Sequence, residues 1–322
     1  MQTAAIVLAA GAGTRMKSKK PKVAHEMLGK PLVAWVLDAA AQAGIQKVAV
    51  VVGHMREQVE PLVAGRGEVV VQEQQRGTAD AVASCRQAFA DFEGSLLVLS
   101  GDCPLITADT MRALVELRER EDAAVVVLTM HPADPFGYGR IIRDASGQVE
   151  RIVEQKDATP EEAAVGECNS GFYCFDAKAL FEALQNVGTN NAQGEFYLTD
   201  VLEICRKAGR PVLGLAAMDD AECLGINSRI QLAQATKIAQ RRINEAHLAA
   251  GVTMLDPDQV WIGPDVSIEP DVEILPQTIL YGVTSIGEDS VIGPNVQLTD
   301  VTVGRGRTVA QTSAIGMSID EA

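Results

Sequence analysis

Hydrophobic and polar positions along the first half of the chain predict strands and helices in alternation. Short apolar runs of the kind that forms buried parallel strands recur at 3–10, 47–52, 68–72, 95–100 and 123–130. Segments with apolar residues at helical spacing separate them, at 31–43, 55–64, 78–89 and 107–120. This order predicts a doubly wound, mostly parallel α/β sheet, in which ligands lie at the carboxyl ends of the strands.

From Gly137 the pattern changes to shorter strands separated by turns. A hairpin is predicted over 137–153, followed by a strand at 169–175 and a helix at 177–185. The segment 190–200 opens a further helix. Polar residues on these short strands and turns suggest a lid that binds a sugar.

The C-terminal third combines a long helix with a repeat. Residues 228–250 contain no glycine or proline, and Gly251 follows them, which predicts a connector helix. Beyond it, aliphatic residues occupy every sixth position: Ile262, Ile268, Ile274, Leu280, Ile286, Ile292 and Leu298. A period of six indicates a left-handed parallel β-helix; the alternative is an antiparallel sheet with a fortuitous period.

The repeat fades after Gly304, and the tail 313–322 fits no register, so we expect a short β-helix. The chain then divides into a first domain at 1–227, a linker helix at 228–251 and a partial β-helix at 252–322.

Composition narrows the class of protein. The 322 residues carry a formal net charge of −15, which argues against a nucleic-acid partner. No apolar run approaches the ~20 residues of a membrane span, and we do not expect the first apolar stretch to be a signal peptide, because it lacks a charged flank and ends in a glycine turn. Six cysteines without C-x-x-C spacing indicate free thiols in a reducing cytoplasm.

A glycine turn follows the first predicted strand. Gly11 and Gly13 allow backbone N–H groups to form an anion-binding nest, and Arg15 and four lysines up to Lys22 follow at once. The dinucleotide fingerprint would need a third glycine at Met16, and the Gly-Lys-Ser/Thr of a Walker A loop is absent. The pattern therefore predicts a site for a small phosphate-bearing substrate, with a solvated lysine cluster as the alternative.

The sequence Leu-x-x-Gly-x-Gly-Thr-Arg-Met, followed by Pro-Lys, resembles the signature of sugar-nucleotide pyrophosphorylases. Further motifs are Gly-Asp-x-Pro-Leu, Gly-Tyr-Gly-Arg, Val-Glu-Gln-Lys-Asp, Asn-Ala-Gln-Gly-Glu-Phe-Tyr-Leu-Thr-Asp and Gly-Ile-Asn-Ser-Arg. With the six-residue repeat, their order resembles the bacterial N-acetylglucosamine-1-phosphate uridylyltransferases, which are bifunctional pyrophosphorylase/acetyltransferases. The resemblance covers nearly the whole chain.

This resemblance implies a Rossmann-like nucleotidyltransferase that transfers UMP from UTP to N-acetylglucosamine 1-phosphate for cell-wall precursor synthesis. It also implies Mg²⁺ as cofactor and a homotrimer formed through the β-helix. Because the repeat is short, acetylation of glucosamine 1-phosphate is not expected of this chain.

The resemblance also implies roles for individual residues. Arg15 and Lys22 would act on the phosphates, while Asp102 and Asn227 would hold the metal. A lone Asp after a strand is usually a helix cap, but the additional match at Asn227 favours the metal. The remaining positions are matched to substrate binding: Leu8, Ala9, Ala10, Gly11, Gln72, Gly77, Thr78, Gly139, Glu154, Asn169 and Thr199. Within this set, Gln72, Gly77 and Thr78 would contact uracil, and the last four the sugar.

Three other functions remain open on the sequence. The first is uridylyl or thymidylyl transfer to another hexose 1-phosphate. The second is a metal-dependent glycosyltransferase, which would carry Asp-x-Asp where this chain has Gly101-Asp102-Cys103. The third is a non-catalytic sensor with a degenerate site.

Overall fold

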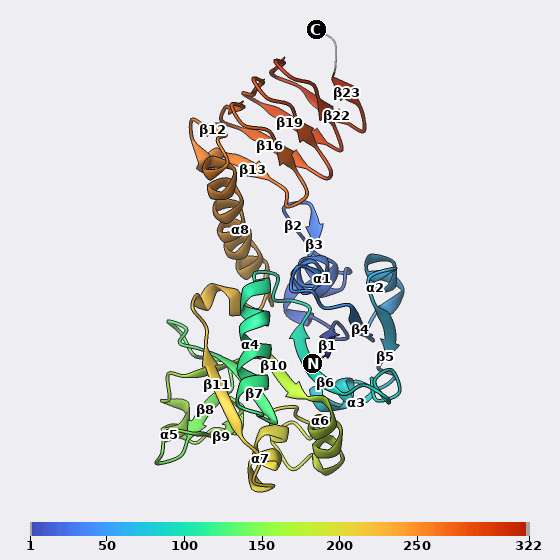
Figure 1. Cartoon of the computed structure of the whole chain (residues 1–322), viewed down its shortest axis with the longest axis vertical. Coiled ribbons are helices and arrows are strands. Elements are labelled where there is room, and N and C mark those ends of the chain that lie inside the picture. The colour runs from blue at the N-terminus through green and yellow to red at the C-terminus, as the bar shows by residue number, and fades with distance from the viewer. Residues whose placement is uncertain (1, 320–322) are drawn as a thin grey trace. The chain divides into compact units, whose positions relative to one another are not determined.

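The computed structural model describes residues 2–319. The chain forms two compact units. The first unit contains residues up to Ala24 and the segment 32–227. The second contains residues 25–31 together with the chain from Ser228 onward. Figure 1 shows the elements of both units.

The first unit is built on a mixed sheet with the strand order β11-β7-β10-β6-β1-β4-β5 (Figure 1). Its strands are β1 (Gln2–Leu8), β4 (Lys47–Val52), β5 (Glu68–Val71), β6 (Gly94–Ser100), β7 (Val125–Met130), β10 (Cys168–Asp176) and β11 (Val212–Ala216). A hairpin of β8 (Arg140–Arg143) and β9 (Val149–Val153) joins through β10. β1, β4, β5 and β6 run parallel to one another, so their carboxyl ends meet at one edge.

Helices cover both faces of this sheet. They are α1 (Leu32–Gln42), α2 (Arg56–Val63), α3 (Thr78–Ala83), α4 (Ala108–Arg120), α5 (Pro160–Ala163), α6 (Ala177–Ala183) and α7 (Asp200–Lys207), with 3-10 turns η1 (Thr14–Met16), η2 (Lys22–Ala24), η3 (Leu184–Asn186) and η4 (Asp220–Cys223). Successive residues of β1 enter opposite cores: Ala4 and Ile6 pack in one buried cluster, Ala5 and Val7 in the other. The predicted doubly wound α/β fold is therefore confirmed.

Several details of the structure differ from what the hydropathy pattern predicts. β10 runs antiparallel between β6 and β7, although the pattern gives no sign of strand direction. The helix expected over 78–89 ends at Ala83 and continues as turns. Strand β11 was not predicted, because its five residues at the sheet edge are only partly buried and include a glycine.

From Ser228 onward, the second unit consists of α8 (Arg229–Ala249) followed by stacked parallel strands (Figure 1). Three short sheets run β12-β15-β18-β21, β13-β16-β19-β22 and β14-β17-β20-β23. Their strands are β12 (Thr253–Met254), β13 (Val260–Ile262), β14 (Ser267–Ile268), β15 (Glu273–Ile274), β16 (Thr278–Tyr281), β17 (Ser285–Ile286), β18 (Val291–Ile292), β19 (Val296–Thr299), β20 (Thr302–Val303), β21 (Thr308–Val309), β22 (Ser313–Ile315) and β23 (Ser318–Ile319), with η5 at Pro257–Gln259. The aliphatic residues of the repeat pair across coils, as Ile262 does with Leu280 and Leu280 with Leu298. The predicted β-helix is confirmed.

The expectation that the tail from Ser313 fits no register is wrong for its described part. β22 pairs with β19, and β23 pairs with β20. The earlier partners Ile262 and Leu280 are eighteen positions apart, whereas Leu298 and Ala314 are sixteen apart. The last coil is therefore shorter, and a search for a strict six-residue period misses it.

A short hairpin from the N-terminal part packs within the second unit. Strands β2 (Glu26–Met27) and β3 (Lys30–Pro31) are joined through Gly29, whose φ is +80°. A Cβ at Gly29 would lie 3.1 Å from Cγ of Tyr281, and Lys30 Nζ donates to Asp265 Oδ1 at 2.6 Å. Hydropathy alone does not indicate this long-range packing.

None of the helices within residues 2–319 combines the length and apolar character required to cross a membrane. All six cysteines lie in the described part of the chain, and each is buried as a thiol.

Candidate active site

A cavity of about 340 Å³ opens in the first unit where the parallel strands end. Its walls come from the turn after β1, the segments after β5 and β6, and the lysine of η2. The cavity brings together nine of the sequence-predicted site residues: Leu8, Ala9, Ala10, Gly11, Lys22, Gln72, Gly77, Thr78 and Asp102. Five further residues line the cavity that sequence reasoning missed: Val23, Gln75, Ala81, Ser100 and Glu195.

The glycine turn leaves one side of the cavity open. A Cβ built on Gly11 would meet no protein atom within 4 Å, so a ligand can approach this backbone closely. At Gly13, whose φ is +59°, a Cβ would lie 2.6 Å from the Cβ of Lys22. Gly13 therefore allows Lys22 to lie against the turn. Arg15 follows in η1, where it is exposed and does not line the cavity.

Lys22 lies between the two side chains predicted to hold a metal. Its Nζ donates to Asn227 Oδ1 at 2.9 Å and forms an ion pair with Asp102. The side chains of Lys22 and Asp102 are only about 15% exposed. The two oxygen-bearing side chains thus converge on one cationic atom although 125 positions separate them in sequence.

A carboxylate and a carboxamide oxygen are the donors that a hard divalent cation takes, with phosphate and water oxygens completing its shell. No group of three or more His, Cys, Asp or Glu side chains in residues 2–319 could hold a metal alone. The neighbouring Cys103 thiol is buried, and burial raises its pKa. The donor set fits a metal bound together with a phosphate ligand.

Gln72 is buried at the cavity wall, and its amide is fixed from one side. Nε2 donates to Asp80 Oδ2 at 2.9 Å and to the carbonyl oxygen of Gly77 at 3.2 Å. Because the NH₂ group of Gln72 already donates to these two acceptors, only the amide oxygen remains for a ligand. Gly77 has φ +121°, and a Cβ there would lie 2.4 Å from the carbonyl oxygen of Phe196, so no other residue fits.

The four residues predicted for the sugar form a second cluster. Thr199 Oγ1 donates to Glu154 Oε1 at 3.3 Å, and the backbone N–H of Asn169 donates to the Gly139 carbonyl oxygen at 2.9 Å. A Cβ at Gly139 would lie 3.5 Å from Glu154 Oε2 and 3.6 Å from Asn169 Cβ. The four residues therefore lie next to one another, although none of them lines the cavity.

Burial raises the pKa of Glu154, and the nearby carboxylates of Asp157 and Asp200 raise it further. The hydrogen bond from Thr199 opposes this shift. Tyr173, which sequence reasoning missed, accepts from Asn169 Nδ2 through its hydroxyl at 2.7 Å. Nothing in the strand pattern distinguishes this buried tyrosine from a core residue.

The segment 196–199 connects the cavity with the sugar cluster. The backbone N–H of Leu198 donates to Thr78 Oγ1 at 3.0 Å, and the next residue, Thr199, donates to Glu154. On the other wall, Gln75 Nε2 donates to the Ala10 carbonyl oxygen at 2.6 Å and supports the glycine turn. Gln75 lies in a polar loop, so the sequence gives no signal for this contact.

Comparison with known proteins identifies relatives over the whole chain. Residues 5–199 match the family described as MobA-like NTP transferase domain. The "Bifunctional protein GlmU" of Caldanaerobacter subterraneus subsp. tengcongensis is 48% identical over 314 residues, which are 98% of this chain and 68% of that protein. The protein of the same name from Lactobacillus delbrueckii subsp. bulgaricus is 49% identical over 321 residues, covering 100% of this chain and 69% of that protein.

Among solved structures, a UDP-glucose pyrophosphorylase in complex with UDP-glucose has a similar fold. The TM-score is 0.58 at 19% identity, with 75% of this chain and 100% of that chain covered. At this identity the likeness concerns the fold alone.

Proposed function

This chain belongs to the family of bifunctional GlmU proteins and carries their NTP transferase domain, and we propose that it transfers UMP from UTP to N-acetylglucosamine 1-phosphate. The products are UDP-N-acetylglucosamine, a cell-wall precursor, and pyrophosphate. The observation that carries the proposal is the convergence of Asp102 and Asn227 on Lys22 at the wall of the cavity. The chain spans about two thirds of these relatives' length, and we assign no acetyl transfer to its residues.

The reaction needs positioning and charge more than acid–base chemistry. A phosphate oxygen of the sugar phosphate attacks the α-phosphorus of UTP, and pyrophosphate leaves. Because the attacking oxygen is already ionised, no side chain has to remove a proton. The protein must hold two anions in line and offset the negative charge that grows on the leaving group.

Phosphate binding is assigned to the glycine turn and its cations. The backbone around Gly11 receives the triphosphate, Lys22 places a point charge near the α-phosphate, and Arg15 offers its planar fork to the β- and γ-oxygens. Asp102 and Asn227 would hold a divalent metal ion, which we propose to be Mg²⁺. When bound, Mg²⁺ supplies positive charge that stabilises the leaving pyrophosphate.

Base and sugar are assigned to the two remaining groups of residues. The oxygen of Gln72 accepts from the N–H of uracil, while the backbone of Gly77 and Thr78 lines the base. Glu154 accepts from sugar hydroxyls, and the amide of Asn169, in β10, forms a hydrogen bond with the sugar.

A substrate panel tests the proposal. Pyrophosphate release is measured with UTP or dTTP, each with N-acetylglucosamine 1-phosphate or glucose 1-phosphate, with and without Mg²⁺. We expect the highest kcat/KM for UTP with N-acetylglucosamine 1-phosphate, and no release without metal. A preference for another pair would favour the related hexose enzymes, and absence of release from every pair would favour a sensor.

The pKa of Glu154 gives a prediction on pH. Above its raised pKa, the ionised carboxylate accepts from two hydroxyls; as the pH falls through that pKa, protonation removes acceptor capacity. The advantage of wild type over Glu154→Gln in KM for the sugar phosphate should therefore shrink toward low pH. The ratio of the two KM values cancels the titration of the substrate's own phosphate, and Glu150→Gln, a half-exposed glutamate of the neighbouring strand, is the control. A ratio that does not change with pH would exclude Glu154 from sugar binding.

A second prediction concerns the open space at Gly11. Gly11→Ala should leave the thermal midpoint unchanged, because the added methyl meets no protein atom. It should raise KM for UTP, because the methyl occupies space that the triphosphate needs. Gly188→Ala is the matched control, since a Cβ there also meets nothing within 4 Å. Equal effects of both substitutions on KM would show that the turn does not contact the nucleotide.

The β-helix is the proposed surface for assembly. We propose a homotrimer through the β-helix, whose coils expose the apolar side chains of Val283, Ile315 and Met317. Sedimentation velocity at several concentrations should show trimers, and a monomer independent of concentration would contradict this.

Six thiols without a disulfide fit a cytoplasmic location. The proposed domains are 1–227, 228–251 and 252–322, with residues 25–31 packed in the second compact unit.

A further inference from the structure

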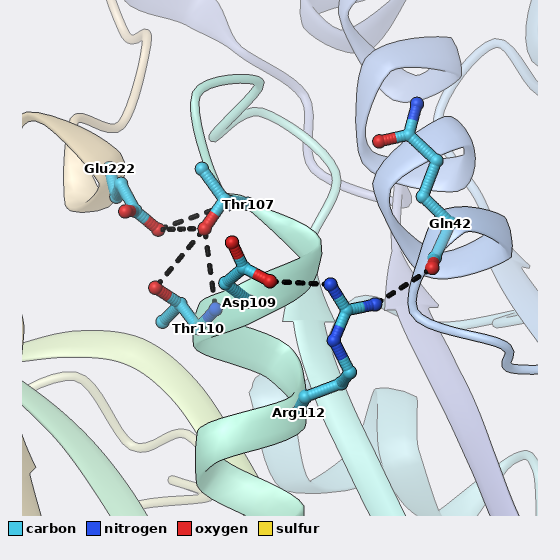
Figure 2. A network of polar contacts seen from close by, with 6 residues as sticks. All are labelled: Gln42, Thr107, Asp109, Thr110, Arg112 and Glu222. Carbon is cyan, nitrogen blue, oxygen red and sulfur yellow. Dashed lines mark hydrogen bonds and ion pairs between the residues drawn. The ribbon is translucent and has the colours of Figure 1, made fainter.

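Glu222 lies outside the cavity, yet it is the only Asp or Glu side chain among the buried residues of 2–319, with 7% exposed. It belongs to η4, and its Oε2 accepts from both the backbone N–H and Oγ1 of Thr107, each at 3.0 Å (Figure 2). Thr107 is the N-cap of α4, where its Oγ1 also accepts from the N–H of Thr110 at 3.3 Å. A carboxylate at this position is stabilised by the positive end of the helix.

The two segments that Glu222 joins are those that carry the proposed metal ligands. Thr107 comes five residues after Asp102, and Glu222 five residues before Asn227. The segments meet a second time closer to the ligands, where the backbone N–H of Ile226 donates to the Asp102 carbonyl oxygen at 2.9 Å. The separation of Asp102 and Asn227 therefore depends on these two connections.

Helix α4 is itself held in place. Arg112, in the second turn of α4, donates through Nη1 to the carbonyl oxygen of Gln42, the last residue of α1, at 2.8 Å (Figure 2). Its Nη2 pairs with Asp109 in the first turn of α4. The N-terminus of α4 is thus a fixed point to which Glu222 attaches the segment that ends in Asn227.

We propose that Glu222 is a positioning residue for the metal site: its contact with Thr107 fixes the segment 220–227 so that Asn227 stays beside Asp102. This inference rests on the proposed function, because it assigns the metal to these two side chains. Loss of the contact should loosen the segment without unfolding the unit, since Asp220 still accepts from the backbone N–H of His131 at 3.2 Å.

The first test needs neither metal nor substrate. Amide hydrogen exchange of the protein alone should increase over 224–227 in Glu222→Ala. It should stay near wild type in Glu222→Gln, whose amide oxygen can still accept from Thr107. Asp109→Ala is the matched control, because Asp109 lies in the same helical turn, is 89% exposed and pairs with Arg112 of its own helix.

The second test measures the site itself, by the binding of Mn²⁺ to the UTP-loaded protein and by steady-state kinetics. Glu222→Ala should weaken Mn²⁺ binding by about tenfold and lower kcat by about ten- to a hundredfold, as is usual when a group that orients metal ligands is removed. KM for the sugar phosphate should change less than about twofold, because the sugar cluster is supported by other segments. Glu222→Gln should restore most of both losses.

The outcomes separate this inference from the proposed function. Unchanged exchange and unchanged Mn²⁺ binding in a folded Glu222→Ala protein would overturn the positioning role, as would equal effects of Asp109→Ala. If Glu222→Ala does not fold, Glu222→Asp keeps the charge but shortens the reach to Thr107, and the same two readouts decide. Wild-type protein without transferase activity would refute the function while leaving the exchange result interpretable.

Discussion

Replacing Asp102 with alanine should lower kcat by about 10³-fold, the largest loss we expect from a single substitution. The carboxylate is one of two protein oxygens that converge on Lys22, and removing it leaves one weak amide ligand for the metal. Initial rates measured over a range of Mg²⁺ concentrations check this result.

Asp102→Asn is the informative comparison, because it keeps an oxygen and the shape of the side chain but loses the charge. We expect an intermediate rate that recovers in part at high Mg²⁺. Near-normal activity of Asp102→Ala at limiting Mg²⁺ would remove Asp102 from the metal site. Circular dichroism and thermal midpoints of both variants control for folding.

Replacing Lys22 with alanine should lower kcat by about 10²-fold, with a smaller change in KM for UTP. The ammonium group lies at the cavity wall beside Asp102 and Asn227, so its charge acts where the transition state gains negative charge. Lys19→Ala is the control, since Lys19 belongs to the same basic cluster but is exposed and outside the cavity.

Arg15 is the second cation assigned to the phosphates. We expect Arg15→Ala to lower kcat as well, because its guanidinium would meet the β- and γ-phosphates once UTP is bound. A substitution at either cation that changes only KM would show that the residue attracts the nucleotide and does not stabilise the transition state.

The main features of the fold could be predicted because they depend on periodicity. Alternating apolar segments gave the α/β sheet, and aliphatic residues at every sixth position gave the β-helix. Strand direction and coil length do not depend on periodicity in this way. The antiparallel course of β10 and the shortened last coil at Ala314 follow from packing partners distant in sequence.

The candidate site likewise has parts that the sequence predicts and parts that only the structure reveals. The glycine turn and Asp102 were found because they follow predicted strands, whose carboxyl ends share an edge. The resemblance supplied Asn227 and the sugar cluster. Neither source indicated that the amide nitrogen of Gln72 already donates to Asp80, or that Glu222 joins the two segments that carry the proposed metal ligands. Such contacts depend on tertiary structure and have no local sequence pattern.

One isotope measurement tests the central claim most directly. N-acetylglucosamine 1-phosphate carrying ¹⁸O at the three non-bridging phosphate oxygens is incubated with UTP, Mg²⁺ and the protein, and the products are followed by ³¹P NMR. If the sugar phosphate attacks the α-phosphorus of UTP, UDP-N-acetylglucosamine forms with ¹⁸O in the bridge between its two phosphorus atoms, and the pyrophosphate is unlabelled. Labelled orthophosphate, an unlabelled bridge or the absence of a nucleotide sugar would contradict the account.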